Sequence, residues 1–359
     1  MMKFLPLGAL LLGLAAAPAV AADMDIVKEM GLRETAIPNW QKPKKVVFRG
    51  DNGRVAFLRE VVKDPSVNIV AARTVDEFKA AVVDADVILG IDRDCAPDVI
   101  PLAKKVRWLQ TGSAGNDGCL VLPRVQSGEA FITNMQRVAG PLVADHAMAL
   151  MLGLARRMPT VVEQQRAHES KPYQNVGLTG KTLLVVGLGG IGTDIAKRAY
   201  AFDMRVIATR NTGREGPDYV SYVGTADELP KLIGEADFVI NVTPLTPATT
   251  GMFNREIFAR MKPSAFFVNV GRGKSVNTMD LVAALQKKQL AGAGLDVTDP
   301  EPLPKDHPLW DMPNVILTPH MAMNMEERTE NTWMVMRENL RRYVAGEKML
   351  SVVDTKRGY

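Results

Sequence analysis

Three side chains suited to acid–base chemistry stand at the ends of successive predicted strands in the second half of the chain. "NVGRGKSV" presents Arg272, "LDVTDPEPLP" presents Glu301 and "LTPHMAM" presents His320. In an open α/β sheet, ligands bind beyond the carboxyl ends of the strands. An arginine can hold a carboxylate and polarise a carbonyl, a histidine can exchange a proton, and a carboxylate can fix the histidine tautomer. Together they predict a site for hydride transfer, although singly they could be a salt bridge, a loop residue and a helix cap.

A glycine-rich turn predicts a dinucleotide site. "VVGLGGIG" places Gly187, Gly189 and Gly192 in the pattern GxGxxG, directly after a predicted strand and at the start of a predicted helix. The first glycine permits a tight turn, the second lets the backbone approach a pyrophosphate, and the third lets the helix pack on the strand. Gly190 and Ile191 open the helix, whose unpaired amides and dipole attract phosphate.

The residue at the end of the next predicted strand indicates which dinucleotide binds. A carboxylate there would bind the ribose 2′-OH of NAD and repel a 2′-phosphate. This chain has Arg210, between Thr209 and Asn211, with Arg214 close behind. Because guanidinium groups bind phosphate through paired charge-assisted hydrogen bonds, the pattern favours NADP(H). NAD(H) stays possible if the arginine points into solvent.

Alternating strands and helices must position these groups. Four short apolar runs between residues 45 and 112 and six more between 181 and 320 alternate with amphipathic helices, which is typical of parallel sheets wound by βαβ units. The last helix, about 325–345, is expected to return to the first domain. We therefore expect an α/β fold with two doubly wound parallel-sheet domains. A Rossmann cofactor domain, residues 141–323, is inserted into a flavodoxin-like substrate domain, residues 45–140 plus 324–353, with a cleft between them.

Composition is that of an ordinary globular protein. The chain has 359 residues, 47% of them hydrophobic and 23% charged, which is enough for two buried cores. Its net charge of +4 is not gathered into a dense basic block, so no nucleic-acid partner is predicted. Cys95 and Cys119 lack metal-ligand spacing, so no metal site is predicted. We expect two unpaired thiols, and an oxidising compartment would keep a disulfide possible.

Residues 1–22 have the three-part pattern of a secretory signal peptide. A lone Lys3 precedes an apolar run, and small residues precede the expected cleavage point. The run is short for a membrane span and is interrupted by Pro6 and Pro18. The leader predicts a periplasmic or secreted protein with no stable membrane span after its removal. An uncleaved anchor and a cytoplasmic enzyme starting at Met24 are the alternatives.

The motifs together resemble those of the D-isomer-specific 2-hydroxyacid dehydrogenases. The match runs from about Lys45 to Val353, with the motifs in order and at family spacing. It is carried by the stretches "TGSAGNDG", "GLGGIG", "TPLTPATTGMFN", "MKPSAFFVNVGRGKSV", "AGAGLDVTDPEPLP" and "HPLWDMPNVILTPH".

The resemblance implies a role for each catalytic candidate. Arg272 would bind the carboxylate and carbonyl of a 2-oxo acid. His320 would protonate the ketone oxygen as the hydride arrives, and Glu301 would pair with His320. The family usually dimerises through the cofactor domain, so a homodimer is expected.

The resemblance also implies binding residues. Backbone amides at Ala114 and Gly115 would face the substrate carboxylate, and Asp296 would hold the nicotinamide carboxamide. Pro244 and Thr249 would lie near the adenosine half of the cofactor.

Several residues depart from the family pattern or receive no role. Met321 and Met323 stand where small residues are usual and are expected to affect the size of the substrate. Three other histidines are interpreted as structural: His146, His168 and His307.

The predicted activity is NADP(H)-dependent reduction of a small 2-oxo acid to the D-2-hydroxy acid. Glyoxylate, hydroxypyruvate and phenylpyruvate-like compounds are the candidate substrates. Formate oxidation is disfavoured, because an acidic residue such as Glu301 would repel the anion. Phosphite oxidation and a non-catalytic dinucleotide-sensing interaction protein remain alternatives. The leader conflicts with this activity, because reduced NADP is expected to be scarce outside the cytoplasm.

Overall fold

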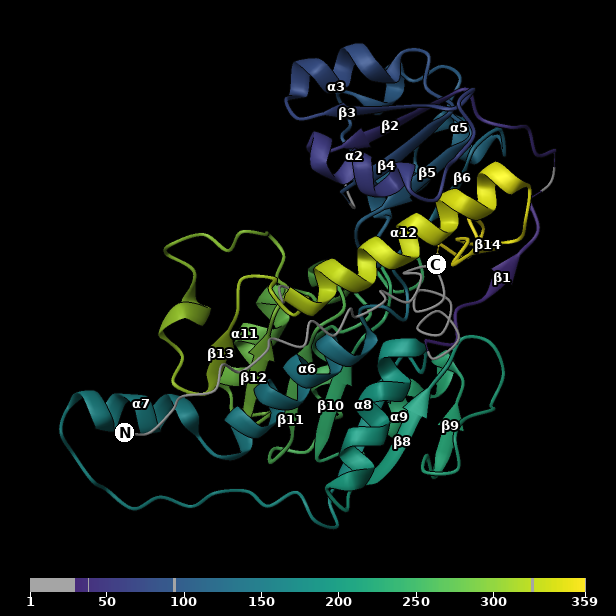
Figure 1. Cartoon of the computed structure of the whole chain (residues 1–359). Helices are drawn as coiled ribbons and strands as arrows, with labels where there is room; N and C mark the ends of the chain where they lie inside the picture. Colours follow the sequence, from purple (N-terminus) through teal and green to yellow (C-terminus); the bar gives the residue numbers. More distant parts are fainter. Residues whose placement is uncertain (1–29, 38, 93–94, 324–325, 359) are drawn as a thin grey trace, which may run out of the picture.

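The computed structural model describes residues 30–37, 39–92, 95–323 and 326–358. The predicted leader, residues 1–22, and the alternative start at Met24 lie outside the described residues. Two parallel sheets, of five and seven strands, form separate lobes of the molecule (Figure 1). In the described part of the chain, no helix combines the length and apolar character that a membrane crossing requires. The predicted α/β class with two parallel sheets is confirmed.

The five-stranded sheet has the strand order β3-β2-β4-β5-β6, which is the flavodoxin-like order. Its strands are β2 (Lys45–Arg49), β3 (Asn68–Ala72), β4 (Val87–Ile91), β5 (Trp108–Thr111) and β6 (Phe131–Thr133). The helices α2 (Asn52–Arg59) and α3 (Val75–Val82) connect the first three strands. The sequence predicted four of these strands and not β6. A three-residue strand is too short to show its own periodicity.

The long helix α12 (Glu326–Ala345) packs on the five-stranded sheet, although it follows the seven-stranded sheet in sequence (Figure 1). Helix and sheet share one apolar cluster, whose members include Trp108, Val335, Met336, Leu340 and Tyr343. Beyond the helix, β14 (Met349–Leu350) pairs with β1 (Glu34–Thr35). The chain thus returns to its first sheet, while the exact domain limits remain a prediction.

The seven-stranded sheet has the order β13-β12-β11-β10-β7-β8-β9, a Rossmann order with one additional strand, β13, at the edge. Its strands are β7 (Thr182–Val186), β8 (Arg205–Thr209), β9 (Tyr222–Gly224), β10 (Phe238–Asn241), β11 (Phe266–Asn269), β12 (Gly292–Leu295) and β13 (Val315–Leu317). All six predicted strands are present, and the three-residue β9 is the one that the sequence did not predict. The strand order reverses between β7 and β10, where such sheets bind ligands.

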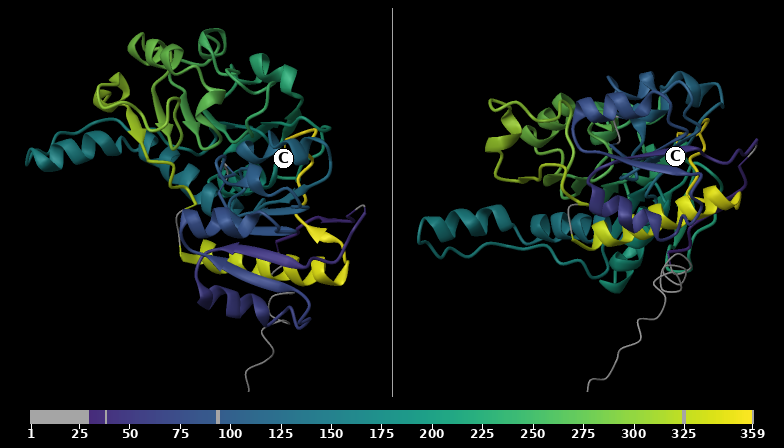
Figure 2. Two further views of the ribbon diagram at one scale, coloured as in Figure 1. Left: turned by 90° about the horizontal axis from the view of Figure 1, so that it is seen from above. Right: turned by 45° about the horizontal axis from the view of Figure 1, so that its top comes forward.

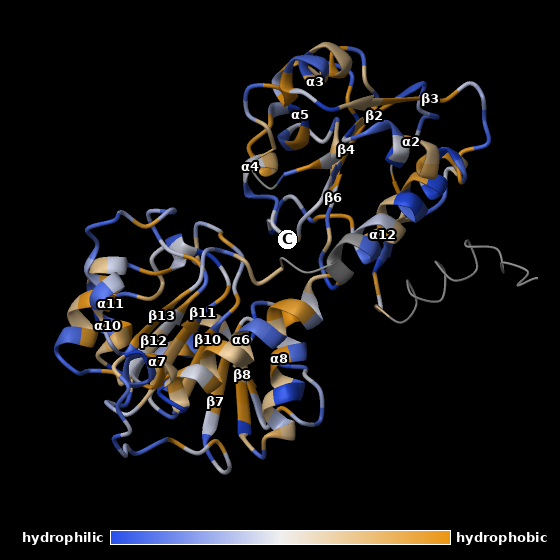
Figure 3. Ribbon diagram, turned by 60° about the vertical axis from the view of Figure 1, so that its left-hand side comes forward, coloured by the Kyte–Doolittle hydropathy of each residue, from blue (hydrophilic) through white to orange (hydrophobic). Residues whose placement is uncertain are grey.

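Helices cover both faces of this sheet, because its central strands alternate between two apolar layers. Leu183 and Val185 of β7 join one buried cluster, whereas Leu184 and Val186 join the other. Figure 3 shows these central strands as apolar ribbons between more polar helix faces. The covering helices are α6 (Gly140–Ala155) and α8 (Gly190–Ala201) on one face, and α9 (Leu229–Leu232), α10 (Arg255–Phe258) and α11 (Thr278–Gln286) on the other.

One helix of this region stands apart. Both views of Figure 2 show α7 (Met158–Arg166) and the segment after it extending away from the sheets. None of its residues is buried, and Met158 and Val162 are 45% and 39% exposed. A helix with apolar side chains in solvent is unlike the rest of the fold, whose helices bury one face.

The two cysteines form a disulfide, so the expectation of two unpaired thiols is wrong. The Cα atoms of Cys95 and Cys119 lie 4.9 Å apart although the residues are separated by 24 positions. Cys95 follows β4 and Cys119 belongs to the short helix α4 (Asp117–Leu120), which follows β5. Because β4 and β5 are neighbouring parallel strands, the segments after them meet at one edge of the sheet.

Candidate active site

The loops that follow β10, β11 and β12 pack against one another at the carboxyl edge of the seven-stranded sheet. A Cβ atom on Gly271 would lie 2.8 Å from the carbonyl oxygen of Thr243. One on Gly273 would lie 1.8 Å from the carbonyl oxygen of Thr298. No side chain fits at either position, so the two glycines allow the three loops to touch. Arg272 lies between them and is therefore held at the centre of this edge.

A buried polar network fixes the main chain of Arg272. The side-chain amide of Asn269 and the hydroxyl of Ser275 both donate to its carbonyl oxygen, over 3.1 and 2.6 Å. Asn241 in turn donates to Asn269 and to Ser275. All three network side chains are fully buried. None of these three residues was predicted from the sequence as part of the site. The sequence did carry one indication of them, an asparagine at the end of each of two otherwise apolar strands.

The guanidinium of Arg272 reaches the other lobe. Its Nε donates to Oδ2 of Asp117 on α4 over 2.9 Å, and its Nη1 donates to the Gly271 carbonyl over 2.8 Å. A Cβ atom on Gly115 would lie 1.9 Å from Nη2, so only glycine lets the guanidinium lie on this backbone. The remaining Nη N–H groups are the ones suited to a planar anion such as a carboxylate. Asp117 was not predicted, because its contact spans the two sheets.

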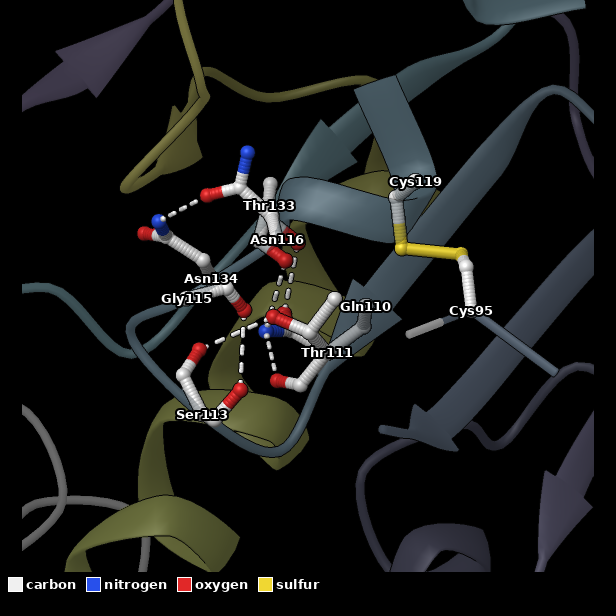
Figure 4. Close-up of a disulfide and its surroundings, with 9 residues drawn as sticks. All are labelled: Cys95, Gln110, Thr111, Ser113, Gly115, Asn116, Cys119, Thr133 and Asn134. Atoms are coloured by element: carbon white, nitrogen blue, oxygen red, sulfur yellow. Dashed lines mark hydrogen bonds between the residues drawn. A yellow bond between two sulfur atoms is a disulfide. The ribbon is translucent and has the colours of Figure 1, made fainter. Parts of the chain in front are cut away.

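Residues 113–116, the substrate loop, present two backbone amides next to this guanidinium. The carbonyl of Ala114 accepts from the side chain of Asn134 over 2.8 Å. The carbonyl of Gly115 accepts from the Ser113 hydroxyl over 2.8 Å (Figure 4). The N–H groups of Ala114 and Gly115 have no acceptor within the described residues, and both residues are half-buried. The loop can therefore donate two hydrogen bonds to an anion.

His320 and Glu301 form a directly bonded pair. Nδ1 of His320 lies 2.6 Å from Oε1 of Glu301, and each side chain is 30% exposed. Because a carboxylate only accepts, Nδ1 carries the proton, and Nε2 is the basic nitrogen of the neutral ring. His320 has φ 52, a left-handed conformation uncommon for a residue with a side chain. The pair has the arrangement of a proton-exchanging histidine oriented by a carboxylate.

Asp296 anchors the segment that carries His320. Its carboxylate accepts from the hydroxyl of Thr318 and from the amides of Met321 and Ala322, over 2.6, 2.9 and 3.1 Å. Burial by itself would raise the pKa of Asp296. Hydrogen bonds from His146, Thr318 and the two amides outweigh burial and bring that pKa to about 2. Asp296 is only 2% exposed, which leaves little of its carboxylate accessible to a ligand. Its expected contact with a nicotinamide remains a prediction.

His146 belongs to this group, although the sequence analysis gave it no role. Its Nε2 lies 2.9 Å from the Thr318 hydroxyl and 3.2 Å from Oδ1 of Asp296. It reaches them from α6, which packs on β12 and β13. A lone histidine on a helix carries no sequence signal for such a long-range contact. His168 is exposed, and His307 caps a short 3₁₀ helix by accepting from the amide of Leu309.

The glycine-rich turn has the geometry that a pyrophosphate requires. Gly187 has φ +105, and its amide donates to the carbonyl of Thr209. A Cβ atom on Gly192 would lie 2.1 Å from the Gly187 carbonyl oxygen, whereas one on Gly189 would meet nothing within 4 Å. The space beside Gly189 is therefore open to a ligand. The first turn of α8, with Gly190 and Ile191, directs its amides to that space, so the residues present fit a dinucleotide.

The two arginines after β8 differ in their bonding. Nη1 of Arg210 donates to the Glu215 carbonyl over 2.8 Å, and this is the one side-chain bond of Arg210 within the described ranges. Arg214 forms an ion pair of 2.8 Å with Glu228 and a hydrogen bond of 3.0 Å with Tyr222. Arg210 thus retains N–H groups that could donate to a phosphate, whereas Arg214 is already bonded to Glu228 and Tyr222.

The other predicted cofactor residues lie around the same turn. Thr209 is 3% exposed within the sheet, where its carbonyl holds the glycine turn, and Asn211 is exposed beside Arg210. Thr249 donates to the carbonyl of Pro244 over 2.7 Å and so closes the loop after β10. The structure thus places Thr209 at the glycine turn and Pro244 directly after Thr243, which lies against Gly187. The contacts of all these residues with a cofactor remain predictions.

Met321 and Met323 have different surroundings. Met321 is 41% exposed beside His320, whereas Met323 packs against the buried cluster of α6 and α8. Of the two methionines, Met321 is therefore the more accessible one, and its effect on substrate size remains a prediction.

Comparisons with known proteins identify the family of this chain. Residues 148–322 match the family described as D-isomer specific 2-hydroxyacid dehydrogenase, NAD binding domain. The chain is 34% identical over 281 residues to glyoxylate/hydroxypyruvate reductase B of Escherichia fergusonii, covering 76% of this chain and 86% of that protein.

Two solved structures share the fold over most of their length. A D-isomer specific 2-hydroxyacid dehydrogenase family protein from Aeromonas salmonicida superposes with a TM-score of 0.76 at 30% identity, covering 87% of this chain and 99% of the other. The NADPH-dependent glyoxylate/hydroxypyruvate reductase of Sinorhizobium meliloti, in complex with NADP and sulfate, gives 0.73 at 25% identity, covering 88% and 100%. With its two parallel sheets and glycine-rich turn, this chain belongs to the D-isomer specific 2-hydroxyacid dehydrogenases and is an NAD(P)-dependent enzyme of that family.

Proposed function

We propose that the protein is an NADP(H)-dependent reductase of small 2-oxo acids that forms the D-2-hydroxy acid. The observation that carries this proposal is the 2.6 Å pair of His320 and Glu301, at the sheet edge from which Arg272 reaches the substrate loop. Glyoxylate and hydroxypyruvate are the proposed substrates, because relatives named for them share this fold.

Arg272 and the substrate loop bind the carboxylate of the 2-oxo acid. The free Nη edge of the guanidinium and the amides of Ala114 and Gly115 converge from the two lobes. A carboxylate between them receives charge-assisted hydrogen bonds from both sides, which orient the neighbouring carbonyl. A small acid is proposed because Met321, next to His320 in sequence, is an exposed bulky side chain that would restrict the space beside the histidine.

His320 supplies the proton. Glu301 holds Nδ1–H, so a protonated ring presents Nε2–H to the developing alkoxide. The carboxylate fixes the Nδ1–H tautomer and keeps the ring in one orientation. When bound, NADPH supplies the hydride that reduces the carbonyl carbon.

Arg210 supports the choice of NADP(H) over NAD(H). Its position at the end of β8 is the one where an acidic residue would select NAD. Its guanidinium has unused donors, whereas that of Arg214 is paired with Glu228.

A homodimer and an exported location are part of the proposal. The exposed apolar residues of α7, Met158 and Val162, support a contact with a second copy. The Cys95–Cys119 disulfide supports an oxidising compartment, in agreement with the predicted leader of residues 1–22.

Steady-state assays test the proposed activity. The mature protein is assayed with glyoxylate, hydroxypyruvate and phenylpyruvate against NADPH and NADH, and with phosphite against NADP⁺. We expect reduction of the smaller 2-oxo acids with NADPH and a D-configured product from hydroxypyruvate. No turnover of any 2-oxo acid would refute the proposal. Phosphite oxidation would favour a phosphite dehydrogenase, and NADPH binding without turnover would favour a dinucleotide-sensing protein.

A further inference from the structure

We propose that the Cys95–Cys119 disulfide and Asp117 act together as a positioning device for Arg272. The disulfide fixes α4, so that Asp117 holds the Nε edge of the guanidinium and turns the Nη edge toward the substrate. This inference rests on the proposed function, in which Arg272 binds the substrate carboxylate.

The helix that carries Asp117 cannot be stable by itself. α4 has four residues, and its N-cap, Asn116, makes no side-chain capping bond. A single helical turn has no cooperative stability of its own, so tertiary contacts must hold it. Cys119 lies two positions after Asp117 in the same turn, and its disulfide ties the turn to the segment after β4 (Figure 4). Both cysteines are fully buried.

The opposite end of the substrate loop is held by hydrogen bonds instead. The side-chain amide of Asn134 donates to the Ala114 carbonyl over 2.8 Å. It also donates to Oδ1 of Asn116 over 3.1 Å (Figure 4). The loop is thus anchored before α4 to Asn134, the residue that follows β6, and within α4 to the disulfide. Without the disulfide, α4 would be held by packing and by the hydrogen bonds of Asn116 and of Asp117 itself, so the position of Asp117 would be less restricted.

Asp117 determines the orientation of the guanidinium. A guanidinium is planar, so two fixed N–H groups define its plane. Asp117 binds Nε and the Gly271 carbonyl binds Nη1, which leaves the remaining Nη N–H groups for a ligand. A substrate carboxylate and Asp117 can therefore bind Arg272 together, at different edges. Without Asp117, the substrate would have to order the side chain itself, and its affinity would fall.

The disulfide forms when the protein folds. Its formation joins the two Sγ atoms and passes two electrons and two protons from the two thiols to a disulfide-type oxidant, which becomes a dithiol. Because both sulfur atoms are buried, a dithiol has no access to the bond in the folded enzyme. The disulfide is therefore a permanent cross-link formed in an oxidising compartment and not a reversible redox switch.

Two preparations of the same chain test the role of the disulfide. Protein made in a reducing cytoplasm and protein oxidised during folding are distinguished by thiol alkylation in denaturant and by mass. We expect the reduced form to show about a tenfold higher KM for the 2-oxo acid, with the Kd for NADPH changed less than twofold. Hydrogen exchange should increase at residues 113–120 and stay unchanged in the seven-stranded sheet. Equal KM values and equal exchange would refute the proposal, and so would global unfolding of the reduced form.

Substitutions test Asp117 separately. D117N keeps the shape of the side chain and removes its charge, so it should raise KM about tenfold with a smaller effect on kcat. D98N is the matched control, an exposed carboxylate in the same lobe, and should leave both constants unchanged. An unchanged KM in D117N would refute the assignment.

A measurement without turnover separates this inference from the proposed function. Oxalate, a dicarboxylate analogue of a 2-oxo acid, is titrated by calorimetry into the NADP⁺-loaded protein. Weaker oxalate binding in D117N and in the reduced form would support the device even if no 2-oxo acid were reduced. Unchanged oxalate binding would refute the device even in an active enzyme.

Discussion

Replacing Arg210 by glutamine should abolish the proposed preference for NADPH. Glutamine keeps a side chain of similar length that can still donate to the Glu215 carbonyl, and it removes the positive charge. A hydrogen bond to a charged partner contributes about 1.5–3 kcal/mol. Because Arg210 is half-exposed, we assign about 2 kcal/mol to its bond with the 2′-phosphate. Loss of that bond corresponds to roughly a 30-fold fall in the ratio of kcat/KM for NADPH to kcat/KM for NADH.

The assay is steady-state reduction of glyoxylate at saturating substrate with each cofactor varied. We expect the kcat/KM for NADH to change less than threefold, because NADH has no 2′-phosphate. R214Q is the matched control: Arg214 is already bonded to Glu228 and Tyr222, so its loss should change the ratio less than threefold. The reasoning would be refuted by an unchanged ratio in R210Q, or by a larger effect in R214Q than in R210Q.

Three further predictions concern the proton-exchanging pair, its anchor and the disulfide. E301Q should lower kcat by about 10²-fold with little change in KM, because an amide can both donate and accept and so no longer fixes the Nδ1–H tautomer of His320; steady-state kinetics would contradict this if KM alone changed. Asp296 has a pKa lowered to about 2 from 3.8, so it contributes stability above about pH 4 that is lost as pH falls toward 2. D296N should therefore reduce the free energy of unfolding at pH 7 by about 2 kcal/mol. In a series of urea titrations from pH 7 to pH 2, the difference in unfolding free energy between D296N and the wild type should become smaller. Replacing Cys95 and Cys119 by alanine removes a cross-link over a separation of 24 residues and should cost about 3 kcal/mol of unfolding free energy; an unchanged urea midpoint would contradict the chain-entropy reasoning.

Long elements and local motifs were predictable from the sequence. Strands such as β7 and β10 are continuous apolar runs, which is the pattern of a parallel sheet buried on both faces. The glycine-rich turn was predictable because its conformation depends on residues adjacent in sequence. Gly187 adopts φ +105, and a Cβ on Gly192 would collide with the turn that it follows. β6 and β9 were not predicted, because three residues carry too little periodicity.

Contacts between distant segments were not predictable. Asp117 and Arg272 are 155 positions apart, and His146 and Thr318 are 172 apart. Their pairing depends on how the two lobes and the covering helix α6 are arranged. The prediction of unpaired cysteines failed for the same reason, because only the adjacency of β4 and β5 brings Cys95 and Cys119 together.

The amino-acid sequence by itself determined the class of fold, the dinucleotide turn and the identities of the Arg, Glu and His side chains. These features depend on short-range conformational preference and on side-chain chemistry, both of which are encoded locally. Only the tertiary structure decided which carboxylate orients Arg272, which donors hold Asp296 and how the cysteines pair. Such choices depend on distances across the fold, and distances between remote residues exist only once the two sheets have formed and packed.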